Sequence, residues 1–399
     1  MARAGTSSRS SIRVGAGYFG QKHPGVYLER EFGLPVGVDF WTGVPVFLGL
    51  LPKDPPLGPP PRPNSPIFLS LWSQFQYHVG KPKRGDFLAY AVRGFFENGG
   101  QECFVVALKE IGFDALTDAL SAMESLDSID LVCAPDLMKD NDAAFELQQI
   151  VVNHCETMGD RFAILDSRLG NSNDQVSHQW SEIDGKNGAI YYPWIKVSGF
   201  DGGLELVPPC GHVAGVYART DNSIGVHKAP ANEVLHGVWD LERQLTNADQ
   251  DKLNPNRINC LRSFPGSGIK VWGARTLSGQ PAWTYVNVRR IFLTAVRWVQ
   301  ANMSDIPFEP NAPKLWPRIE RELTTYFNDQ FLAGALKGRT PQEAFYVKCD
   351  AETNTPEHRD LGQVVAEIGL APTIPYEFVV VRLIHGAKGI SITGPVYPQ

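Results

Sequence analysis

The sequence predicts an α/β protein, a mixed sheet with packed helices and an extended arm at each end. From residue 86 onward, segments with helical periodicity alternate with short apolar runs rich in β-branched residues. This alternation is typical of right-handed crossovers and a mainly parallel sheet. The last third changes to two amphipathic helices followed by three strand-like runs. Both ends are polar or rich in glycine and proline, which favours extended arms.

The first third contains an arm, a strand and a connector. Residues 1–22 are rich in Gly, Ser and Arg and predict the first arm. The apolar run at 43–51 predicts a buried strand. The proline-rich segment 52–63 excludes a helix interior and a central strand, so we expect polyproline II or loop there.

The middle of the chain predicts the α/β layer. The expected helices and strands alternate in this order: helix 86–96, strand 103–108, helix 113–124, strand 129–133, helix 141–157 and strand 162–165. Residues 168–187 are polar and predict a loop. A strand at 189–197 follows, and the small residues of 210–219 predict a short helix suited to close packing.

The glycines of Gly266-Ser-Gly268-Ile-Lys270 raise the question of a phosphate-binding loop. Such a loop ends a strand and opens a helix, so that free N–H groups and the helix dipole meet the anion. Here extended runs stand on both sides of the glycines, and Val271 occupies the position of the required Ser or Thr. We therefore predict a β-hairpin.

The last third predicts two helices, at 283–302 and 314–336. Thr340-Pro-Gln-Glu343 has the pattern of a capping box with proline at the first helical position. Three strands are expected after it, at 344–349, 361–370 and 377–383. The remaining segment 384–399 is expected to be the second arm.

Composition narrows the class of protein. A length of 399 residues favours two or three domains. A net charge of −6 does not indicate binding to nucleic acid, which favours basic proteins. No apolar run reaches the about 20 residues of a membrane span, and the N-terminus lacks a secretory pattern. We expect the protein to assemble in the cytoplasm. We expect no insertion into a membrane.

Metal and cofactor chemistry has little support in the sequence. The six cysteines are far apart and form no CxxC pair, which favours buried thiols. One of these cysteines and three histidines are candidate metal ligands, but their spacing fits no zinc pattern: Cys210, His212, His227 and His236. We expect neither a metal nor a cofactor.

Three aspartates at the ends of predicted strands keep an enzyme open as the alternative. They are Asp130, Asp136 and Asp166. Ligands of open α/β sheets bind at strand ends, but ordinary loops also carry aspartate there. The alternative is a soluble α/β enzyme or ligand-binding protein with its site near Asp130 and Asp166.

Basic residues on the two C-terminal helices allow two interpretations. The first helix carries Arg289, Arg290 and Arg297, and the second begins with Lys314, Arg318 and Arg321. They could form a docking surface for an acidic partner. They could equally belong to a solvated helix face with pairs such as Arg318 and Glu322.

Motifs in a fixed order carry a resemblance to one family. They include Pro24-Gly-Val-Tyr27, Phe95-Phe-Glu-Asn-Gly-Gly100, Gly225-Val-His-Lys-Ala-Pro-Ala-Asn-Glu233, Leu253-Asn-Pro-Asn-Arg-Ile-Asn-Cys-Leu-Arg262, Tyr285-Val-Asn-Val-Arg-Arg290, Phe308-Glu-Pro-Asn311 and Leu315-Trp316. From about residue 23 to 385, the chain resembles the sheath proteins of contractile injection systems and contractile phage tails.

The resemblance implies a structural protein rather than an enzyme. Sheath subunits form six-membered rings that stack helically around an inner tube and contract to drive it into a target. The implied partners are further copies of the chain, sheath paralogues, the inner tube protein, and baseplate and cap proteins. Neither nucleic acid nor direct membrane insertion is implied.

The resemblance also implies a division of the chain and two contact regions. The expected parts are an N-terminal arm (1–22), a core sheath domain in two pieces (23–109 and 201–385), an inserted outer α/β domain (110–200) and a C-terminal arm (386–399). The expected inter-subunit strand residues are Ile12, Arg13, Val14, Ile390, Ser391, Ile392 and Thr393. The tube-contact candidates are Lys314, Arg318 and Arg321.

Overall fold

The structure is a computed structural model. It describes residues 41–62, 64–140, 143–304, 306, 309–373, 379–386 and 389–393. The predicted N-terminal arm, with Ile12, Arg13 and Val14, lies outside the described residues. Among the residues that are described, no helix is both long and apolar enough to cross a bilayer.

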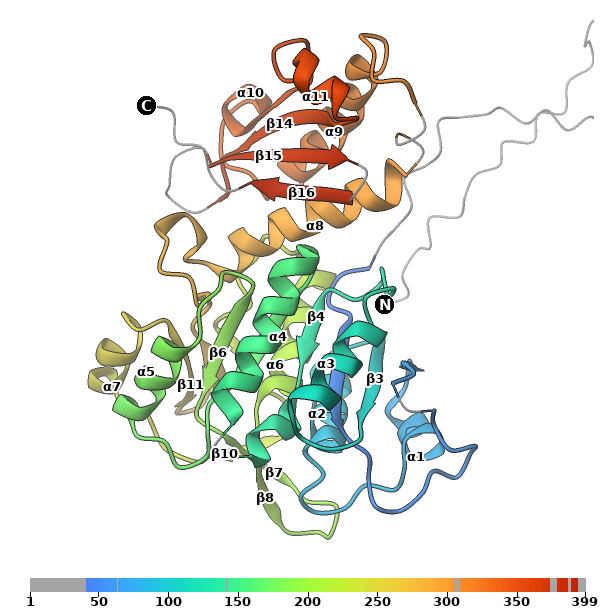
Figure 1. The fold of residues 1–399 in the computed structure, drawn as a ribbon. Coiled ribbons are helices and arrows are strands. Elements are labelled where there is room, and N and C mark those ends of the chain that lie inside the picture. Colours follow the sequence, from blue (N-terminus) through green and yellow to red (C-terminus); the bar gives the residue numbers. More distant parts are fainter. Residues whose placement is uncertain are drawn as a thin grey trace, which may run out of the picture. The chain divides into compact units, whose positions relative to one another are not determined.

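A nine-stranded mixed sheet forms the larger part of the protein (Figure 1). Its strand order is β2-β3-β1-β4-β5-β6-β11-β12-β9. The parallel strands are β3 (Cys103–Leu108), β1 (Pro45–Leu50), β4 (Leu131–Cys133), β5 (Phe162–Asp166), β6 (Gly188–Tyr192) and β11 (Ile258–Phe264). Antiparallel strands add β2 (Ile67–Leu69) at one end and β12 (Gly268–Trp272) and β9 (Glu233–Val234) at the other. The predicted mainly parallel sheet is confirmed.

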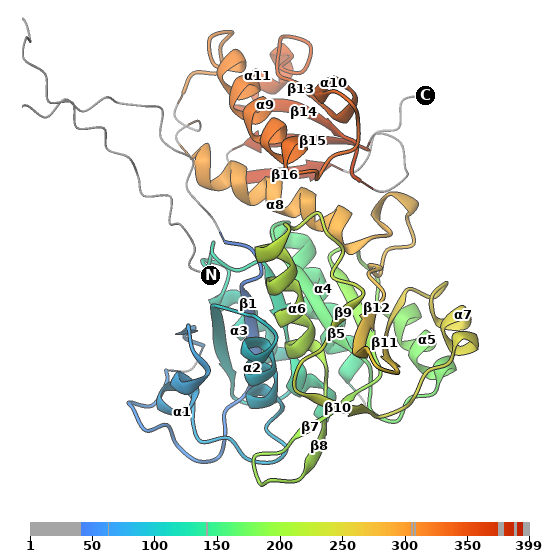
Figure 2. The same ribbon diagram turned by 180° about the vertical axis from the view of Figure 1, so that it is seen from behind.

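Helices cover both faces of this sheet, and each face has its own buried apolar cluster (Figures 1 and 2). One face carries α2 (Phe87–Glu97) and α6 (Cys210–Ser223). The other carries α3 (Phe113–Ala122), α4 (Ala144–Met158) and α5 (Asn173–Glu182). Shorter helices are α1 (Phe75–His78) and α7 (Asn247–Leu253), with single 3-10 turns at Trp72–Gln74, Pro135–Lys139 and Pro281–Trp283.

Helix α5 contradicts the loop predicted at 168–187. A capping box begins this helix, since the Ser172 hydroxyl accepts from the Gln175 N–H and the Gln175 side chain accepts from the Ser172 N–H. Only Val176 and Gln179 of the helix are buried. One buried apolar residue gives no amphipathic period, so the pattern could not reveal the helix.

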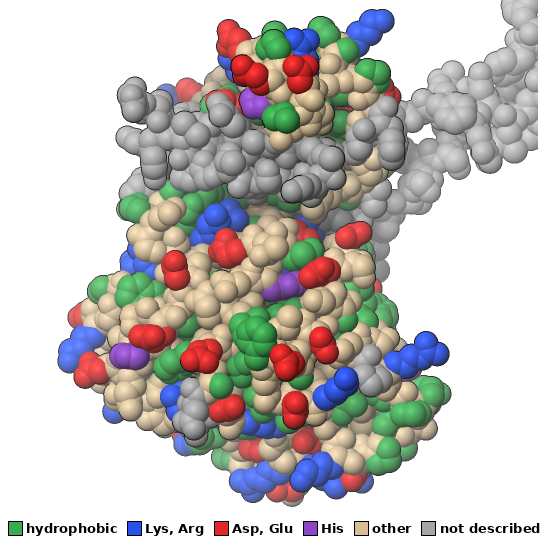
Figure 3. Space-filling view, in the orientation of Figure 1, with side chains coloured by type: hydrophobic (Ala, Val, Ile, Leu, Met, Phe, Trp, Pro, Cys, Tyr) green, Lys and Arg blue, Asp and Glu red, His purple; other side chains and the backbone are tan. Residues whose placement is uncertain are grey.

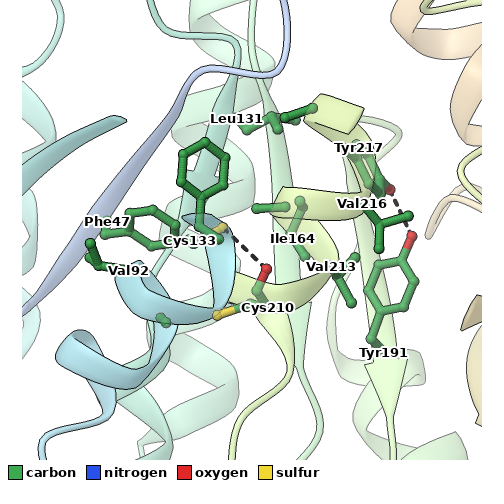
Figure 4. Close-up of a cluster of buried hydrophobic side chains, with 14 of the residues drawn as sticks. Phe47, Val92, Leu131, Cys133, Ile164, Tyr191, Cys210, Val213, Val216 and Tyr217 are labelled. Atoms are coloured by element: carbon green, nitrogen blue, oxygen red, sulfur yellow. Dashed lines mark hydrogen bonds between the residues drawn. The ribbon is translucent and has the colours of Figure 1, made fainter. Parts of the chain in front are cut away.

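Helices α2 and α6 pack at very close range, as the small residues of 210–219 predicted. A Cβ atom on Gly211 would lie 2.2 Å from the carbonyl oxygen of Ala91, and one on Gly215 would lie 2.6 Å from that of Phe95. Figure 4 shows the opposite side of α6, where Val213, Val216 and Tyr217 face the sheet. Helix α6 is therefore held between α2 and the strands.

The strand predicted at 189–197 is two strands in different sheets. β6 ends at Tyr192, and β7 (Ile195–Ser198) belongs to a three-stranded sheet with β8 (Leu204–Val207) and β10 (Val238–Leu241). Pro193 stands between them and has no N–H to continue the ladder.

The glycine-rich loop near residue 266 is the tip of a hairpin, as predicted. β11 and β12 are antiparallel, with Phe264 opposite Gly268. Gly266 and Gly268 have φ angles of 76° and 77°, a region that favours glycine. No helix follows Lys270, so the phosphate-loop interpretation fails.

The C-terminal part forms a separate core from two helices and a four-stranded antiparallel sheet. The helices are α8 (Val286–Asn302) and α9 (Trp316–Leu332). The strands are β13 (Phe345–Lys348), β14 (Val364–Leu370), β15 (Val379–Gly386) and β16 (Gly389–Thr393), in that spatial order. The short helices α10 (Pro341–Ala344) and α11 (Pro356–Asp360) join these elements.

The predicted capping box at Thr340 does not form. Proline does occupy the first position of α10, but the Thr340 side chain makes no capping hydrogen bond. The Glu343 carboxylate instead accepts from the backbone N–H of Arg339, at 2.8 Å. The four-residue helix ends at Ala344, and β13 begins at the next residue, Phe345.

The predicted division into domains stays a prediction, and its parts share one sheet. The expected outer domain (110–200) and both pieces of the expected core (23–109 and 201–385) contribute strands to the same nine-stranded sheet. The border at residue 110 follows β3, which pairs with β1 inside that sheet. The change in sequence pattern marks the step from buried strand to surface helix, not a boundary between sheets.

Candidate functional site: the arginine joint and helix α9

Arg290 of α8 makes a buried ionic cluster with two aspartates, which we call the arginine joint. Its guanidinium donates to the two carboxylate oxygens of Asp221 at 2.8 and 2.6 Å. One nitrogen also donates to Asp130 Oδ2 at 2.8 Å. The guanidinium lies 5.0 Å from the ring centroid of Tyr217. The side chains of all three joint residues are at most 5% exposed.

The arginine joint ties the C-terminal core to the nine-stranded sheet. Asp221 belongs to α6, and Asp130 directly precedes β4. The Asp130 carboxylate also accepts from the backbone N–H groups of Gly43 and Val44, at 3.0 and 2.7 Å, just before β1. One cluster therefore fixes the positions of α8, α6 and the starts of two strands.

Electrostatics keeps Arg290 charged despite its burial. Burial alone would lower the pKa of Arg290, but the carboxylates of Asp221 and Asp130 raise it above the ordinary value. A buried charge without a partner is costly, whereas a paired and hydrogen-bonded one is tolerated. Separating α8 from the sheet would therefore leave three buried charges unpaired.

Two further arginines of α8 face the interior. Arg289 Nε donates to Asn187 Oδ1 at 2.6 Å, and its guanidinium lies 4.8 Å from the Trp283 ring centroid. Arg297 donates to the carbonyl oxygens of Asp127 and Ser128 at 3.4 and 3.1 Å. The docking surface considered for α8 is excluded, because its three arginines hold the fold together.

The three tube-contact candidates lie at the start of helix α9, next to acidic residues of the same helix. Its apolar stripe is buried against the C-terminal sheet and α8, and the ring centroid of Tyr326 lies 4.4 Å from that of Trp298. Lys314 and Arg321 are exposed. Arg318 is half-buried and pairs with Glu322 at 2.9 Å, the i,i+4 pair expected from the sequence.

The aspartates of the enzyme alternative act as structural groups. Asp130 belongs to the arginine joint. Asp136 accepts from the Leu50 N–H at 2.7 Å and pairs with Lys139 at 2.7 Å. Asp166 accepts from the N–H of Cys210, the first residue of α6, at 2.8 Å. Burial raises the pKa of Asp166 to about 7.

The cysteine and histidines considered for a metal do not come together. Among the described residues, no group of three His, Cys, Asp or Glu is placed to hold a metal ion. Cys210 and His212 are fully buried in α6. His212 packs against Gly94 of α2, and neither of its ring nitrogens has a hydrogen-bond partner. The half-buried His227 and the exposed His236 lie outside this helix.

The predicted C-terminal strand residues form β16. This strand pairs with β15 of the same chain, with Ile390 opposite His385, Ser391 opposite Ile384, Ile392 opposite Leu383 and Thr393 opposite Arg382. β16 is the last strand of the four-stranded sheet as described, so its outer edge offers unpaired backbone groups. Exchange of these strands between subunits stays a prediction.

Comparison with known proteins shows which family the chain resembles. The phage tail sheath protein central domain family matches residues 109–277. A chain of the anti-feeding prophage baseplate is 28% identical with a TM-score of 0.71, over 90% of this chain and 98% of that one. The chain is therefore similar to phage tail sheath proteins. A chain of the contracted PVC sheath complex, from an extracellular contractile injection system, gives the same identity and TM-score over 91% and 97%.

The chain also resembles curated phage tail sheath proteins over part of its length. It is 28% identical to the tail sheath protein of Salmonella phage ViI over 180 residues, which are 44% of this chain and 28% of that protein. The chain therefore matches less than a third of that relative. The comparisons give no support to the enzyme alternative.

The arginine joint was not predicted from the sequence. Asp130 and Arg290 were both noted, but for different roles, and they stand 160 residues apart. Asp221 lies in α6, for which the small residues predicted close packing but no charged contact. The available signal was an Arg-Arg pair in an otherwise apolar part of a helix, where an unpaired charge would be costly.

Proposed function

We propose that this chain is a tail sheath subunit that forms six-membered rings stacked helically around an inner tube, and that the stack shortens to drive the tube into a target. One observation carries the proposal. The chain is 28% identical to a chain of the anti-feeding prophage baseplate and to a chain of the PVC sheath complex, and it covers 97–98% of the length of each. The neighbour from the PVC particle belongs to a sheath complex in the contracted state.

The arginine joint supports contraction by rotation of rigid subunits. Turning the C-terminal core against the large sheet would separate Arg290 from Asp130 and Asp221, and each buried charge would lose its partner. Removing one partner of such a cluster costs about 3–5 kcal/mol. The contacts between subunits are therefore expected to change on contraction while the subunit keeps its fold.

The two arms are proposed to link neighbouring subunits during this movement. Residues 1–22 and 386–399 would add strands to sheets of adjacent copies, and the edge of β15 that β16 covers within one copy is one place where such a strand can add. About five intermolecular hydrogen bonds at ~0.5–1.5 kcal/mol each would give roughly 2–7 kcal/mol per arm. Such links hold while other contacts break.

Helix α9 is proposed to contact the inner tube. Lys314, just before α9, and Arg321, in its second turn, are exposed, and the half-buried Arg318 lies between them in sequence. Polar contacts with an acidic tube surface would be weak one by one and sensitive to salt, so they could be released when the sheath contracts. Baseplate and cap proteins are the further proposed partners.

The proposed role is structural, without catalysis, cofactor or metal. Asp130 and Asp166 already accept hydrogen bonds from the backbone that they position. The protein would assemble in the cytoplasm and become part of a phage-tail-like particle.

Electron microscopy of the purified chain tests the proposal. Negative staining of the full-length protein is expected to show hollow rings or tubes. A variant that lacks residues 1–22 is expected to remain folded, with an unchanged circular dichroism spectrum, and to lose assembly. Full-length protein that stays monomeric at every concentration would contradict the sheath function, and unchanged assembly of the truncated variant would contradict only the role of the arm.

A further inference from the structure

One end of the nine-stranded sheet carries an exposed surface that is both apolar and basic. We call residues 51–84, between β1 and α2, the basic apolar segment. It contains five Lys or Arg residues and one Asp. Four of its large apolar side chains are strongly exposed: Leu57 79%, Phe68 47%, Leu71 59% and Tyr77 50%. Exposed apolar groups gathered in one segment are typical of an interaction surface.

The fold of this segment brings the stretch around Leu57 next to the stretch around Tyr77. The backbone N–H groups of Leu57 and Gly58 donate to the carbonyl oxygens of Gln76 and Tyr77, at 3.1 and 2.9 Å. Phe68 lies on the edge strand β2, with its ring centroid 5.4 Å from that of Phe104. Figures 1 and 2 both show α1, within this segment, at the side of the sheet beyond β3.

An acidic stretch lies at the same end of the sheet, where α3 contacts β3. Residues 110–127, which include α3, contain five Asp or Glu residues and no Lys or Arg. Phe113 stands among these acids and is 64% exposed. Acidic side chains predominate over the face that carries α3 and α4 (Figure 3). We call residues 110–127 the acidic segment.

The two segments do not neutralise each other within one copy. Of the basic residues, Lys83 pairs with Asp54 at 2.6 Å and Arg84 with Asp201 at 3.6 Å. Across the described part of the chain, no ion pair joins the basic apolar segment to the acidic segment. Helix α3 is fixed over the sheet by its buried Leu116 and Leu120, so it cannot turn towards the basic apolar segment.

We propose that the basic apolar segment of one copy docks on the acidic segment of a neighbouring copy. Charge complementarity selects this occupant, since the same chain presents both signs together with exposed apolar side chains on each surface. Two different patches that fit each other form a head-to-tail contact, and repetition of such a contact gives a ring or a helix. The inference rests on the proposed sheath function and adds to it the surface by which subunits meet.

Charge reversal tests this contact. Variant one, Lys53→Glu with Lys81→Glu, reverses exposed charges of the basic apolar segment. Variant two, Asp118→Lys with Glu124→Lys, reverses the acidic segment and leaves Asp114 in the first turn of α3, where it favours the helix. The control, Lys252→Glu with Arg359→Glu, makes the same change in net charge as variant one, on α7 and α11.

The readout is the critical concentration for assembly, measured by sedimentation. Each variant is expected to raise it at least about tenfold at low salt, and the control by less than about twofold. Mixing the two variants in equal amounts, or combining all four substitutions in one chain, is expected to restore assembly, because opposite charges then face each other again. Salt is expected to weaken wild-type assembly.

A third variant tests the apolar part of the contact without changing any charge. Leu57→Ser with Leu71→Ser removes exposed apolar surface without changing charge, and it is also expected to raise the critical concentration. Circular dichroism melting checks the fold of every variant. Wild-type tubes together with unchanged assembly of both charge variants would overturn the inference and leave the sheath function standing. A wild type that never assembles would contradict the sheath function itself, and the inference with it.

Discussion

Arg290 of α8 and Asp221 of α6 share two hydrogen bonds, of 2.8 and 2.6 Å, across 69 residues of sequence. The bonds join a nitrogen to each carboxylate oxygen, the two-pronged geometry for which arginine is suited. The contact lies in the interior, where both side chains are at most 3% exposed. It therefore connects two parts of the protein that have separate apolar cores.

Replacing Arg290 by Met is expected to lower the free energy of unfolding by about 3–5 kcal/mol, because Asp130 and Asp221 would remain as buried charges. Urea unfolding followed by tryptophan fluorescence measures the loss. Arg290→Lys is expected to recover only part of it, since an ammonium cannot make the two-pronged contact. Arg321→Met is the exposed control, and a loss at Arg290 no larger than at Arg321 would refute the role of the arginine joint.

Substitution of Gly211 or Gly215 by Ala is expected to destabilise the protein by about 1–3 kcal/mol or more. The added methyl group would lie within 2.2 or 2.6 Å of a carbonyl oxygen of α2, so the two helices would have to move apart. Gly279→Ala is the matched control, because a Cβ there meets nothing within 4 Å. Thermal melting compares the three variants, and equal melting temperatures would show that α2 and α6 are not tightly packed.

Much of the fold follows from apolar patterns, and the exceptions have physical reasons. The runs at 103–108 and 162–165 are buried on both faces, so their continuous apolar character predicted the strands correctly. Helix α5 buries one apolar residue and begins at a polar capping box, so it gave no such pattern. The arginine joint depends on packing between distant segments, which no local pattern contains.

Asp166 makes stability depend on pH in the range from about 4 to about 7. Burial raises its pKa from 3.8 to about 7, so the folded protein favours the protonated form. The corresponding stabilisation is fully present below the unfolded pKa of 3.8 and is lost as the pH rises through about 7, at no more than about 1.4 kcal/mol per pH unit.

Asp166→Asn keeps an acceptor for the Cys210 N–H and removes the titrating group. Its free energy of unfolding is expected to fall less than that of the wild type between pH 5 and pH 8. Urea unfolding at both pH values measures the difference. The same fall in both proteins would mean that Asp166 does not titrate in this range.

His212 is expected to make the protein sensitive to acid. Burial, with a smaller effect of Arg93, lowers the pKa of His212 from 6.5 to about 3, so the folded protein holds the neutral ring. Stability from this group is present above pH 6.5 and is lost as the pH falls towards 3. His212→Met fills the same apolar site without a titrating group.

The histidine variant is expected to unfold at a lower pH than the wild type in an acid titration followed by circular dichroism. At pH 8 it should be at least as stable, because neither ring nitrogen of His212 has a hydrogen-bond partner to lose. An unchanged acid midpoint would show that other groups determine acid unfolding.

The most direct measurement of the sheath assignment is a cryo-electron microscopy reconstruction of the assembled, purified wild-type chain. The account predicts a hollow helical tube with six copies in each layer, in which residues 1–22 and 386–399 pair with strands of adjacent copies and Arg290 stays bound to Asp130 and Asp221. A compact closed oligomer without a channel, or a tube in which each copy keeps both arms on its own sheet, would contradict it.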